Sequence, residues 1–506
     1  MNETLPLQPH DRFNQELEAN THPPEWKNPS PAPTYNLVVI GGGTAGLVCA
    51  AGAAGLGGKV ALIEERLMGG DCLNFGCVPS KALIRSSREN ADIRSAKEFG
   101  IDLSQAPSQN FTAVMDRMRR LRARISPHDS AERFKQLGVD VFLGSGRFTS
   151  PDTVQVESST LTFRKAVIAT GARPAALPIE GLAETGYQTN ETIFSLTEFP
   201  RRFAVIGGGP LGCELAQAFS RLGSSVTILD KAPHLLPRED QEAAELLQKI
   251  FAGENIDLKQ TVRVSRIEKH NGDKVIRYRK NDTDAEVIVD EILLAAGRAP
   301  NIDGLDLEKA EVEYDPRRGV IVDDHLQTTN SSIYAAGDCC SRYKFTHIAE
   351  AQARIALQNA LFLGRKKMSS LTIPWCTYTD PEIAHTGMYE KDSQGRDIEM
   401  DTFKIDLSEI DRAVVDGEED GFVKIHTVRN SDKILGATIV ARHAGEMISE
   451  LTLAITGNIG LKTIAATIHP YPTQSEIIKH AADAYNRSRL TPGIKKLFSL
   501  WLQWRR

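Results

Sequence analysis

Two stretches of the sequence repeat one arrangement: an apolar run, a glycine-rich turn, and a second apolar run that ends in an acid. In the first stretch the apolar runs are residues 37–40 and 60–63, and Glu64 follows the second run. The turn reads G-x-G-x-x-G, with Gly41, Gly43 and Gly46. Such glycines permit a tight turn, close approach of a pyrophosphate, and packing of the next helix on its strand. The stretch therefore predicts a dinucleotide-binding βαβ unit, with Glu64 at the ribose.

The second stretch lies about 165 residues further along the chain. Its apolar runs are residues 203–206 and 226–229, and its turn contains Gly207, Gly209 and Gly212. Two dinucleotide sites are typical of a flavin enzyme in which a nicotinamide reduces FAD. Asp230 ends the second run and would accept the 2′-OH of NADH while repelling the 2′-phosphate of NADPH. We expect NADH, with NADPH as the alternative because Lys231 reduces that repulsion.

Two cysteines follow the first stretch in GGDCLNFGCVPSKAL, residues 69–83. Cys72 and Cys77 are so close in the chain that a bond between them would stabilise the fold little. PSKAL predicts the start of a helix, whose dipole favours a thiolate at Cys77. A zinc site needs two further Cys or His nearby, and the next histidine is His128. The pair is therefore expected to exchange electrons with a flavin.

The overall composition excludes several other classes. A chain of 506 residues predicts two to four domains, and its net charge of −6 gives no reason to expect nucleic-acid binding. We expect the basic stretch 116–125 to be a solvated helix face. No apolar run reaches the ~18 residues of a membrane span, and the first 34 residues resemble neither a secretion signal nor a transit peptide. Seven sparse cysteines favour a reducing cytoplasm.

Taken in order, these motifs resemble the class I pyridine nucleotide–disulfide oxidoreductases. The matching segments are GGDCLNFGCVPSKAL, VIATGARP, LLAAGRAPN, SIYAAGDCC and YTDPEIAHTG. The resemblance implies an α/β fold of the glutathione reductase type, with two Rossmann-like dinucleotide-binding domains and a C-terminal α+β dimerisation domain in a homodimer. The expected parts are a mobile polar arm (1–34), an FAD-binding domain (35–188), an NAD(P)-binding domain (189–305), a central domain that completes the FAD site (306–372), an interface domain (373–490) and a basic–aromatic tail (491–506).

The resemblance also implies roles for single residues. Cys72 would be the interchange thiol that faces the substrate, and Cys77 the charge-transfer thiol against the flavin. Lys81 would pair with Glu214 near the flavin N5, and Asp338 would bond the ribityl chain. No structural metal is expected. The remaining positions expected at the cofactors are Gly70, Thr170, Gly171, Gly297 and Gly337, besides the glycines and acids of the two turns.

The C-terminal segment HPYPTQSEIIKHAAD departs from the disulfide-reducing members of that family. Those members read His-x-His-Pro-Thr-x-x-Glu, and the second His, from the partner subunit, moves protons to and from the thiols. Here that position is Tyr471, although Glu476 is retained. A phenol of pKa about 10 is a poor base at neutral pH, and loss of a positioned base costs about 10²–10⁴ in rate. His469, two residues earlier, is an alternative base.

Tyrosine at this position resembles the mercuric reductase branch, whose acceptor is a thiophilic metal ion. Soft Hg(II) prefers two thiolates, which the reduced Cys72/Cys77 pair supplies. The chain lacks that branch's vicinal cysteine pair at the C-terminus and its N-terminal Cys-x-x-Cys module. We expect an NAD(P)H oxidoreductase that passes electrons to Hg(II). The alternative is a dihydrolipoamide dehydrogenase or another disulfide reductase with an atypical proton donor.

Two further features lie outside these roles. In the tail TPGIKKLFSLWLQWRR, Thr491 and Pro492 predict a helix start, and the basic–aromatic composition fits either an anionic membrane surface or docking on the dimer. A membrane-held redox sensor is therefore a third possible function. The vicinal Cys339 and Cys340 are expected in the core rather than in a metal relay. His347 is expected to begin a helix near the flavin.

Overall fold

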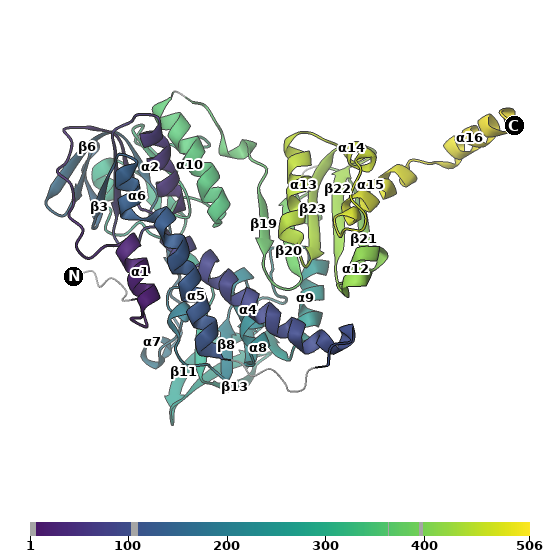
Figure 1. Cartoon of the computed structure of the whole chain (residues 1–506), viewed down its shortest axis with the longest axis horizontal. Coiled ribbons are helices and arrows are strands. Elements are labelled where there is room, and N and C mark those ends of the chain that lie inside the picture. Colours follow the sequence, from purple (N-terminus) through teal and green to yellow (C-terminus); the bar gives the residue numbers. More distant parts are fainter. Residues whose placement is uncertain (1–6, 103–109, 363, 394–397) are drawn as a thin grey trace. The chain divides into compact units, whose positions relative to one another are not determined.

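The chain divides into two compact units, Met1–Ala232 with Glu254–Ser370 and Pro233–Gly253 with Leu371–Arg506. No helix among the residues described is both long and apolar enough to span a membrane. The computed structural model describes residues 7–102, 110–362, 364–393 and 398–506 (Figure 1).

The first unit contains a seven-stranded sheet in the order β3-β2-β1-β6-β5-β4, with β18 paired to β6. Strands β1, β2, β3, β6 and β18 run parallel. β1, β2 and β18 are buried over nearly their whole length, as expected of their apolar sequences, and β6 is buried at its last three residues, Ala166–Ile168. Ile168 pairs with Ile40 and with Ala335, so β1, β6 and β18 end at the same edge. The bounds are β1 (Tyr35–Ile40), β2 (Val60–Glu64), β3 (Val139–Leu143), β4 (Gly146–Ser150), β5 (Thr153–Val156), β6 (Ser159–Ile168) and β18 (Ile333–Ala335).

A second parallel sheet in this unit has the order β10-β9-β8-β14. The two predicted βαβ units are thereby confirmed, since their apolar runs lie in β1, β2, β8 and β9. The bounds are β8 (Arg202–Ile206), β9 (Ser225–Asp230), β10 (Ile256–Gln260) and β14 (Glu291–Leu294). Smaller antiparallel sheets are formed by β11 (Arg263–His270), β12 (Asp273–Lys280) and β13 (Thr283–Val289), by β7 (Ala172–Pro174) with β15 (Arg298–Pro300), and by β16 (Tyr314–Asp315) with β17 (Gly319–Val320).

Helix α2 (Thr44–Gly55) begins at the first glycine-rich turn and lies beside α10 (Thr346–Leu361) in Figure 1. A Cβ on Gly46 would lie 1.8 Å from the carbonyl oxygen of Gly41, so only glycine lets the helix approach its strand this closely. Gly43 caps the helix without a side chain, which leaves the first helical N–H groups for a phosphate.

Helix α8 (Pro210–Arg221) repeats this construction at the second turn. A Cβ on Gly212 would lie 2.0 Å from the carbonyl oxygen of Gly207, and Gly209 is the side-chain-free N-cap. The remaining helices of the unit are α3 (Gly70–Asn74), α4 (Cys77–Ser95), α5 (Phe111–Ile125), α6 (Ala131–Gln136) and α7 (Leu182–Thr185).

The N-terminal segment is not a mobile arm over its described residues, so that prediction is wrong for residues 7–34. Helix α1 (Arg12–Thr21) packs against α5 (Figure 1), and Leu17 is fully buried. Trp26 Nε1 donates to the Val141 carbonyl at 3.1 Å. The buried face of α1 is Asn14, Leu17 and Thr21, which is too polar to appear as an apolar stripe. Residues 1–6 lie outside the described residues.

The second unit is a five-stranded antiparallel sheet in the order β19-β20-β23-β22-β21, packed with helices that include α13 and α15. The strand bounds are β19 (Pro374–Thr377), β20 (Glu382–Gly387), β21 (Met400–Asp406), β22 (Phe422–Val428) and β23 (Ile434–Ala441). The helix bounds are α9 (Gln241–Gly253), α11 (Glu390–Ser393), α12 (Asp411–Asp416), α13 (Ala444–Thr456), α14 (Leu461–Ala466), α15 (Glu476–Ser488) and α16 (Pro492–Trp504).

Residues 233–253 group with this second unit, although the sequence suggested that they belong to the NAD(P)-binding domain. The buried Glu239 explains the grouping: it accepts hydrogen bonds from Trp375 Nε1 at 2.9 Å and from Tyr389 Oη at 2.5 Å. Lys424, also buried, forms an ion pair with Asp240 at 2.9 Å. These polar contacts join segments far apart in the sequence, which no local pattern shows.

We expect Gly46→Ala to destabilise the protein by about 1–3 kcal/mol or more and to weaken flavin retention, because the new methyl group would overlap the Gly41 carbonyl oxygen. Urea unfolding and the flavin content of the purified protein would show both effects. Gly55→Ala, in the same helix, is the control, since a Cβ there meets nothing within 4 Å. Equal stability of the two variants would contradict the close helix–strand contact.

Candidate active site

Three loops that carry predicted cofactor-binding residues meet at the carboxyl edge of the seven-stranded sheet. The Gly41 turn follows β1, Thr170 and Gly171 follow β6, and Gly337 and Asp338 follow β18. Ligands of parallel α/β sheets bind in the crevice outside this edge. The strand register therefore places residues from three distant parts of the sequence where a dinucleotide binds.

Each predicted ribose-binding acid is hydrogen-bonded to its own glycine-rich turn. Glu64 accepts the Gly42 N–H at 2.5 Å, and Asp230 accepts the Gly208 N–H in the same way. Burial raises the pKa of Glu64, and its backbone hydrogen bonds oppose that rise. Both carboxylates lie at the end of the second strand of a βαβ unit, which is the ribose position.

The cysteine segment packs directly on the first glycine-rich turn. The Gly69 N–H donates to the Gly42 carbonyl at 2.8 Å. A Cβ on Gly70 would lie 2.7 Å from the Cα of Gly43, and Gly70 also has a positive φ of 56°. Two glycines in contact therefore bring α3, which contains Cys72, against the N-terminus of α2.

The two cysteines have unequal environments. Cys77 is the first residue of α4 and is exposed, whereas Cys72 is half-buried in α3, and both are free thiols. The pKa of Cys77 is lowered to about 6, chiefly by its hydrogen bond with Cys72 and further by Thr346 and the charge of Lys81. The bond to Cys77, with burial, raises the pKa of Cys72. Cys77 is therefore the thiolate of the pair near neutral pH.

Thr346 was not found from the sequence. Its Oγ1 lies 3.3 Å from the Cys77 Sγ, and it begins α10, next to the His347 that the resemblance drew attention to. The sequence signal for Thr346 was a hydroxyl residue at the start of the helix that we expected near the flavin.

Lys81 and Glu214 form an ion pair, with Nζ and Oε2 2.7 Å apart and the Glu214 side chain 5% exposed. Lys81 lies one turn beyond Cys77 in α4, and Glu214 lies in α8. The pair links the cysteine helix to the helix of the second glycine-rich turn. Its action on a flavin stays a prediction.

Arg298 is a second residue that sequence reasoning missed. Its Nη2 donates to Asp71, the residue before Cys72, and to the Ala172 carbonyl. Its Nε lies 3.5 Å from the Asp338 carboxylate. Arg298 follows Gly297 in LLAAGRAPN, so it stood inside a motif already singled out. Its guanidinium joins the cysteine segment to the loop after β18.

Arg122 connects the cysteine segment to helix α1. It is 2% exposed, and it donates to the Asn74 carbonyl at 2.7 Å and to Asn14 Oδ1 of α1 at 2.6 Å. Burial lowers the pKa of Arg122 to about 10, which leaves it charged at neutral pH. Stretch 116–125 is helical as expected, but it is not a wholly solvated face. The sequence signal for a buried face was the helical spacing of four residues of α5, namely Met115, Met118, Arg119 and Arg122.

The predicted C-terminal residues lie in the second unit. Tyr471 is 71% exposed, and its hydroxyl donates to Asp411 Oδ2 at 3.0 Å, which raises its pKa. The His469 side chain, in contrast, is only 6% exposed, and its Nε2 lies 3.0 Å from Glu450 Oε1. Glu476 accepts the Thr473 N–H at 3.4 Å, in the first turn of α15. Tyr471 is therefore the accessible proton-bearing side chain of this loop.

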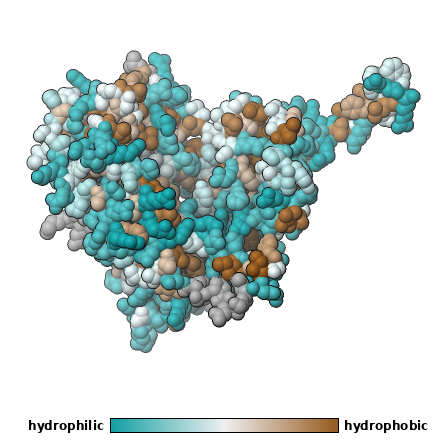
Figure 2. Space-filling model, in the orientation of Figure 1, coloured by the Kyte–Doolittle hydropathy of each residue, from teal (hydrophilic) through white to brown (hydrophobic). Residues whose placement is uncertain are grey.

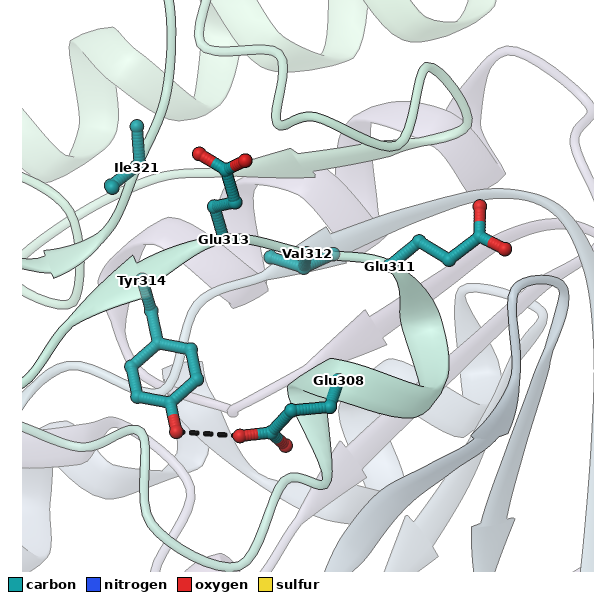
Figure 3. A pocket seen from close by; sticks show the side chains of 6 residues that line it. All are labelled: Glu308, Glu311, Val312, Glu313, Tyr314 and Ile321. Carbon is teal, nitrogen blue, oxygen red and sulfur yellow. Dashed lines mark hydrogen bonds between the residues drawn. The ribbon is translucent and has the colours of Figure 1, made fainter.

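Cys339 is fully buried in the core of the first unit, and Cys340 packs against the same cluster. A separate depression of about 590 Å³ (Figure 3) lies in residues 308–321, where Tyr314 donates to Glu308 at 2.6 Å. It contains none of the predicted site residues. Within the described residues, no group of three or more His, Cys, Asp or Glu is arranged to hold a metal ion.

The first unit has residues suited to bind the pyrophosphate and the ribose of FAD. The side-chain-free N-terminus of α2 offers N–H groups to a pyrophosphate, Glu64 lies at the ribose position, and a Cβ at Gly171 would meet nothing within 4 Å. Residues 35–353 match the family model "pyridine nucleotide-disulphide oxidoreductase", and residues 373–482 match the dimerisation domain of that family. The chain belongs to this family, whose members use FAD and NAD(P)H, and the dimerisation domain supports a homodimer.

Within the family, the chain is a flavin disulfide oxidoreductase with relatives of two activities. It is 31% identical to the mercuric reductase of Staphylococcus aureus over 453 residues, which are 90% of this chain and 83% of that protein. It is 32% identical to the dihydrolipoyl dehydrogenase of Bacillus subtilis strain 168 over 469 residues, which are 89% of this chain and 98% of that protein. The similar identities do not separate the two substrates.

Solved structures confirm the glutathione reductase-like fold. LpdA from Mycobacterium tuberculosis superposes with a TM-score of 0.82 at 27% identity, covering 89% of this chain and 99% of that one. The Cu(II) complex of the HOCl-induced flavoprotein disulfide reductase RclA from Escherichia coli gives a TM-score of 0.79 at 26% identity, covering 90% and 100%.

We expect the alkylation rate of the reduced protein by iodoacetamide to rise with pH around a midpoint near 6, because Cys77 is the thiolate of the pair. Thr346→Val and Lys81→Met should each move this midpoint upward, since each removes a group that stabilises the thiolate. The modified cysteine would be identified by peptide mass analysis. A midpoint that stays near that of a free thiol, or modification of Cys72 first, would contradict the assignment.

We expect Arg122→Met to lower the free energy of unfolding by about 2–4 kcal/mol, because it leaves the Asn14 and Asn74 oxygens buried without their donor. Urea unfolding measures the change. The exposed Arg124→Met, in the same helix, should stay within about 0.5 kcal/mol of the parent. Equal effects would mean that Arg122 does not support the cysteine segment.

Proposed function

We propose that the protein oxidises NAD(P)H and passes the electrons through the Cys72–Cys77 disulfide to a thiophilic acceptor, namely Hg(II). One observation carries the choice of acceptor: the side chain of Tyr471 is exposed in the C-terminal loop, while His469 is held by Glu450. A disulfide substrate needs protons delivered to its leaving thiols, whereas a metal ion bound by two thiolates needs none.

In this function FAD, when bound, accepts a hydride from the nicotinamide and supplies two electrons. The residues around Cys77 keep its sulfur deprotonated: Cys72 and Thr346 hydrogen-bond to it, and Lys81 stabilises its charge. Cys72 loses its proton when a soft metal ion binds, because a coordinating thiol is deprotonated. Two thiolates then hold Hg(II). The two Hg–S bonds break as the sulfurs give up two electrons and join to form the Cys72–Cys77 disulfide, and Hg(0) leaves.

The comparisons support this acceptor without singling it out. Mercuric reductases stand among the relatives at 31% identity, and a structural neighbour was solved as a Cu(II) complex. Arg298 contacts both Asp71, the neighbour of Cys72, and Asp338 in the loop after β18, so it fixes the position of the cysteine segment. The interchange sulfur is thus carried by a segment fixed on both sides.

The second candidate is a dihydrolipoyl dehydrogenase or another disulfide reductase. The His469–Glu450 contact of 3.0 Å favours it, because a carboxylate-bound imidazole is the kind of base that such a reaction uses. In that case His469 would have to turn outward, since its side chain is 6% exposed.

The remaining assignments belong to the same proposal. Residues 35–188 bind FAD with residues 306–372, residues 189–232 and 254–305 bind the nicotinamide, and residues 373–490 form the dimer interface. Asp230 favours NADH, since its carboxylate stands at the ribose position after β9. The sparse cysteines support a cytoplasmic location.

We expect Hg(II), supplied with excess small thiol, to stimulate NADH or NADPH oxidation by the FAD-loaded enzyme, with NADH the better donor. Cys72→Ala should abolish the stimulation, and Cys376→Ala, at a half-buried cysteine outside the site, should preserve it. Nicotinamide absorbance and mercury vapour release measure the reaction. If Hg(II) only inhibits, the acceptor assignment fails.

The same assay distinguishes the second candidate. Wild-type enzyme should oxidise dihydrolipoamide slowly, and Tyr471→His should raise that rate by up to about 10²–10⁴ if the imidazole is positioned as a base. Rapid wild-type turnover that Tyr471→His does not improve, and that His469→Gln removes, would instead establish the disulfide reductase.

A further inference from the structure

Helix α16 presents large apolar side chains to solvent along its whole length. Every residue from 486 to 506 is exposed, and Leu497 and Trp504 are 65% and 76% exposed. Figure 2 shows apolar side chains gathered on this helix. Apolar surface of this size on a single element marks an interaction site. The exposed apolar residues of α16 are Ile494, Leu497, Phe498, Leu500, Trp501, Leu502 and Trp504.

The helical spacing sorts these side chains onto one broad face. At 3.6 residues per turn they occupy an arc of about 200°, and the other side holds Lys495, Lys496, Ser499 and Gln503. A helix that packs on a protein core usually needs an apolar stripe only slightly wider than about 100°. An apolar face twice as wide needs a partner that covers half of the helix surface, and a lipid interface does so.

The charges of the segment have one sign. The last acidic residue of the chain is Asp483, and the six charged residues after it are Arg487, Arg489, Lys495, Lys496, Arg505 and Arg506. Lys495 and Lys496 stand at the two edges of the polar side, where their long stems reach along apolar surface while the ammonium groups stay in water. This arrangement complements negatively charged headgroups.

The two tryptophans of the helix lie together. The ring centroids of Trp501 and Trp504 are 5.2 Å apart, so they form one aromatic surface within the apolar face. Indole rings favour the boundary between hydrocarbon and water because they are apolar with one polar N–H.

We propose that α16 lies in the surface of an anionic lipid bilayer and holds the enzyme there. Thirteen residues of helix extend about 20 Å, less than the ~30 Å hydrocarbon core, so the helix lies in the interface plane and does not span. Thr491 fixes where the helix starts, since its hydroxyl accepts the Ile494 N–H at 3.4 Å with Pro492 in the first turn. The membrane site is independent of the acceptor at Cys72.

Vesicle sedimentation of the full-length FAD-loaded enzyme tests this. We expect binding to phosphatidylcholine vesicles with about 30% phosphatidylglycerol to be at least ~10-fold tighter than to phosphatidylcholine alone, and to weaken with salt. A variant with Lys495→Glu and Lys496→Glu should bind the anionic vesicles at least ~10-fold more weakly. A variant with Leu497→Asp and Trp501→Asp should lose the binding, together with the blue shift of tryptophan emission.

Leu56→Asp is the matched control, because Leu56 is 67% exposed on the first unit and should not affect binding. NADH oxidation with a soluble dye as acceptor should be unchanged in all these variants. The proposal is overturned if the intact enzyme does not bind anionic vesicles, or if deleting residues 491–506 leaves binding unchanged. It is also overturned if that deletion converts a dimer to a monomer in light scattering, because α16 would then be covered by a second copy.

Discussion

The contact between Gly41 and Gly46 determines where the chemistry of this protein is located. A helix can lie this close to its strand only without a Cβ, and the approach puts the N-terminus of α2 at the carboxyl edge of the sheet. The cysteine segment then packs on the same turn through Gly43 and Gly70. Phosphate-binding donors and reactive thiols are thus brought together by contacts between backbone atoms.

A second constraint acts on the other side of that segment. Arg122 binds the carbonyl of Asn74, which lies between the two cysteines, and at the same time binds Asn14 of α1. Leu73 and Phe75, also between the cysteines, are buried with Leu17 of α1. The N-terminal helix is therefore part of the support of the redox segment. Burying a guanidinium is costly without hydrogen bonds, and Asn14 of α1 accepts one of the two that Arg122 donates, so this support depends on the presence of α1.

The sequence predicted the parts of this architecture whose signals are local. Glycine spacing, apolar runs and a terminal acid identified both βαβ units, because each feature has a strict backbone cause. The role of α1 could not be predicted in this way, since its buried face includes Asn14 and Thr21 and its partner Arg122 looks like a solvated charge. Arg298 likewise pairs with Asp71 across more than two hundred residues, a distance at which no spacing rule applies.

In the proposed function, the reactivity of the thiols and the choice of acceptor depend on different parts of the chain. The low pKa of Cys77 depends on groups of the first unit: its partner Cys72, the Thr346 hydroxyl and the Lys81 charge. Those groups would prepare the same thiolate for a disulfide or for a metal ion. In the function proposed above, the choice between them falls to the loop of the second unit, where Tyr471 is exposed and His469 contacts Glu450. A change of one side chain in that loop, such as Tyr471→His, would alter proton delivery while the groups that hold the Cys77 thiolate stay unchanged.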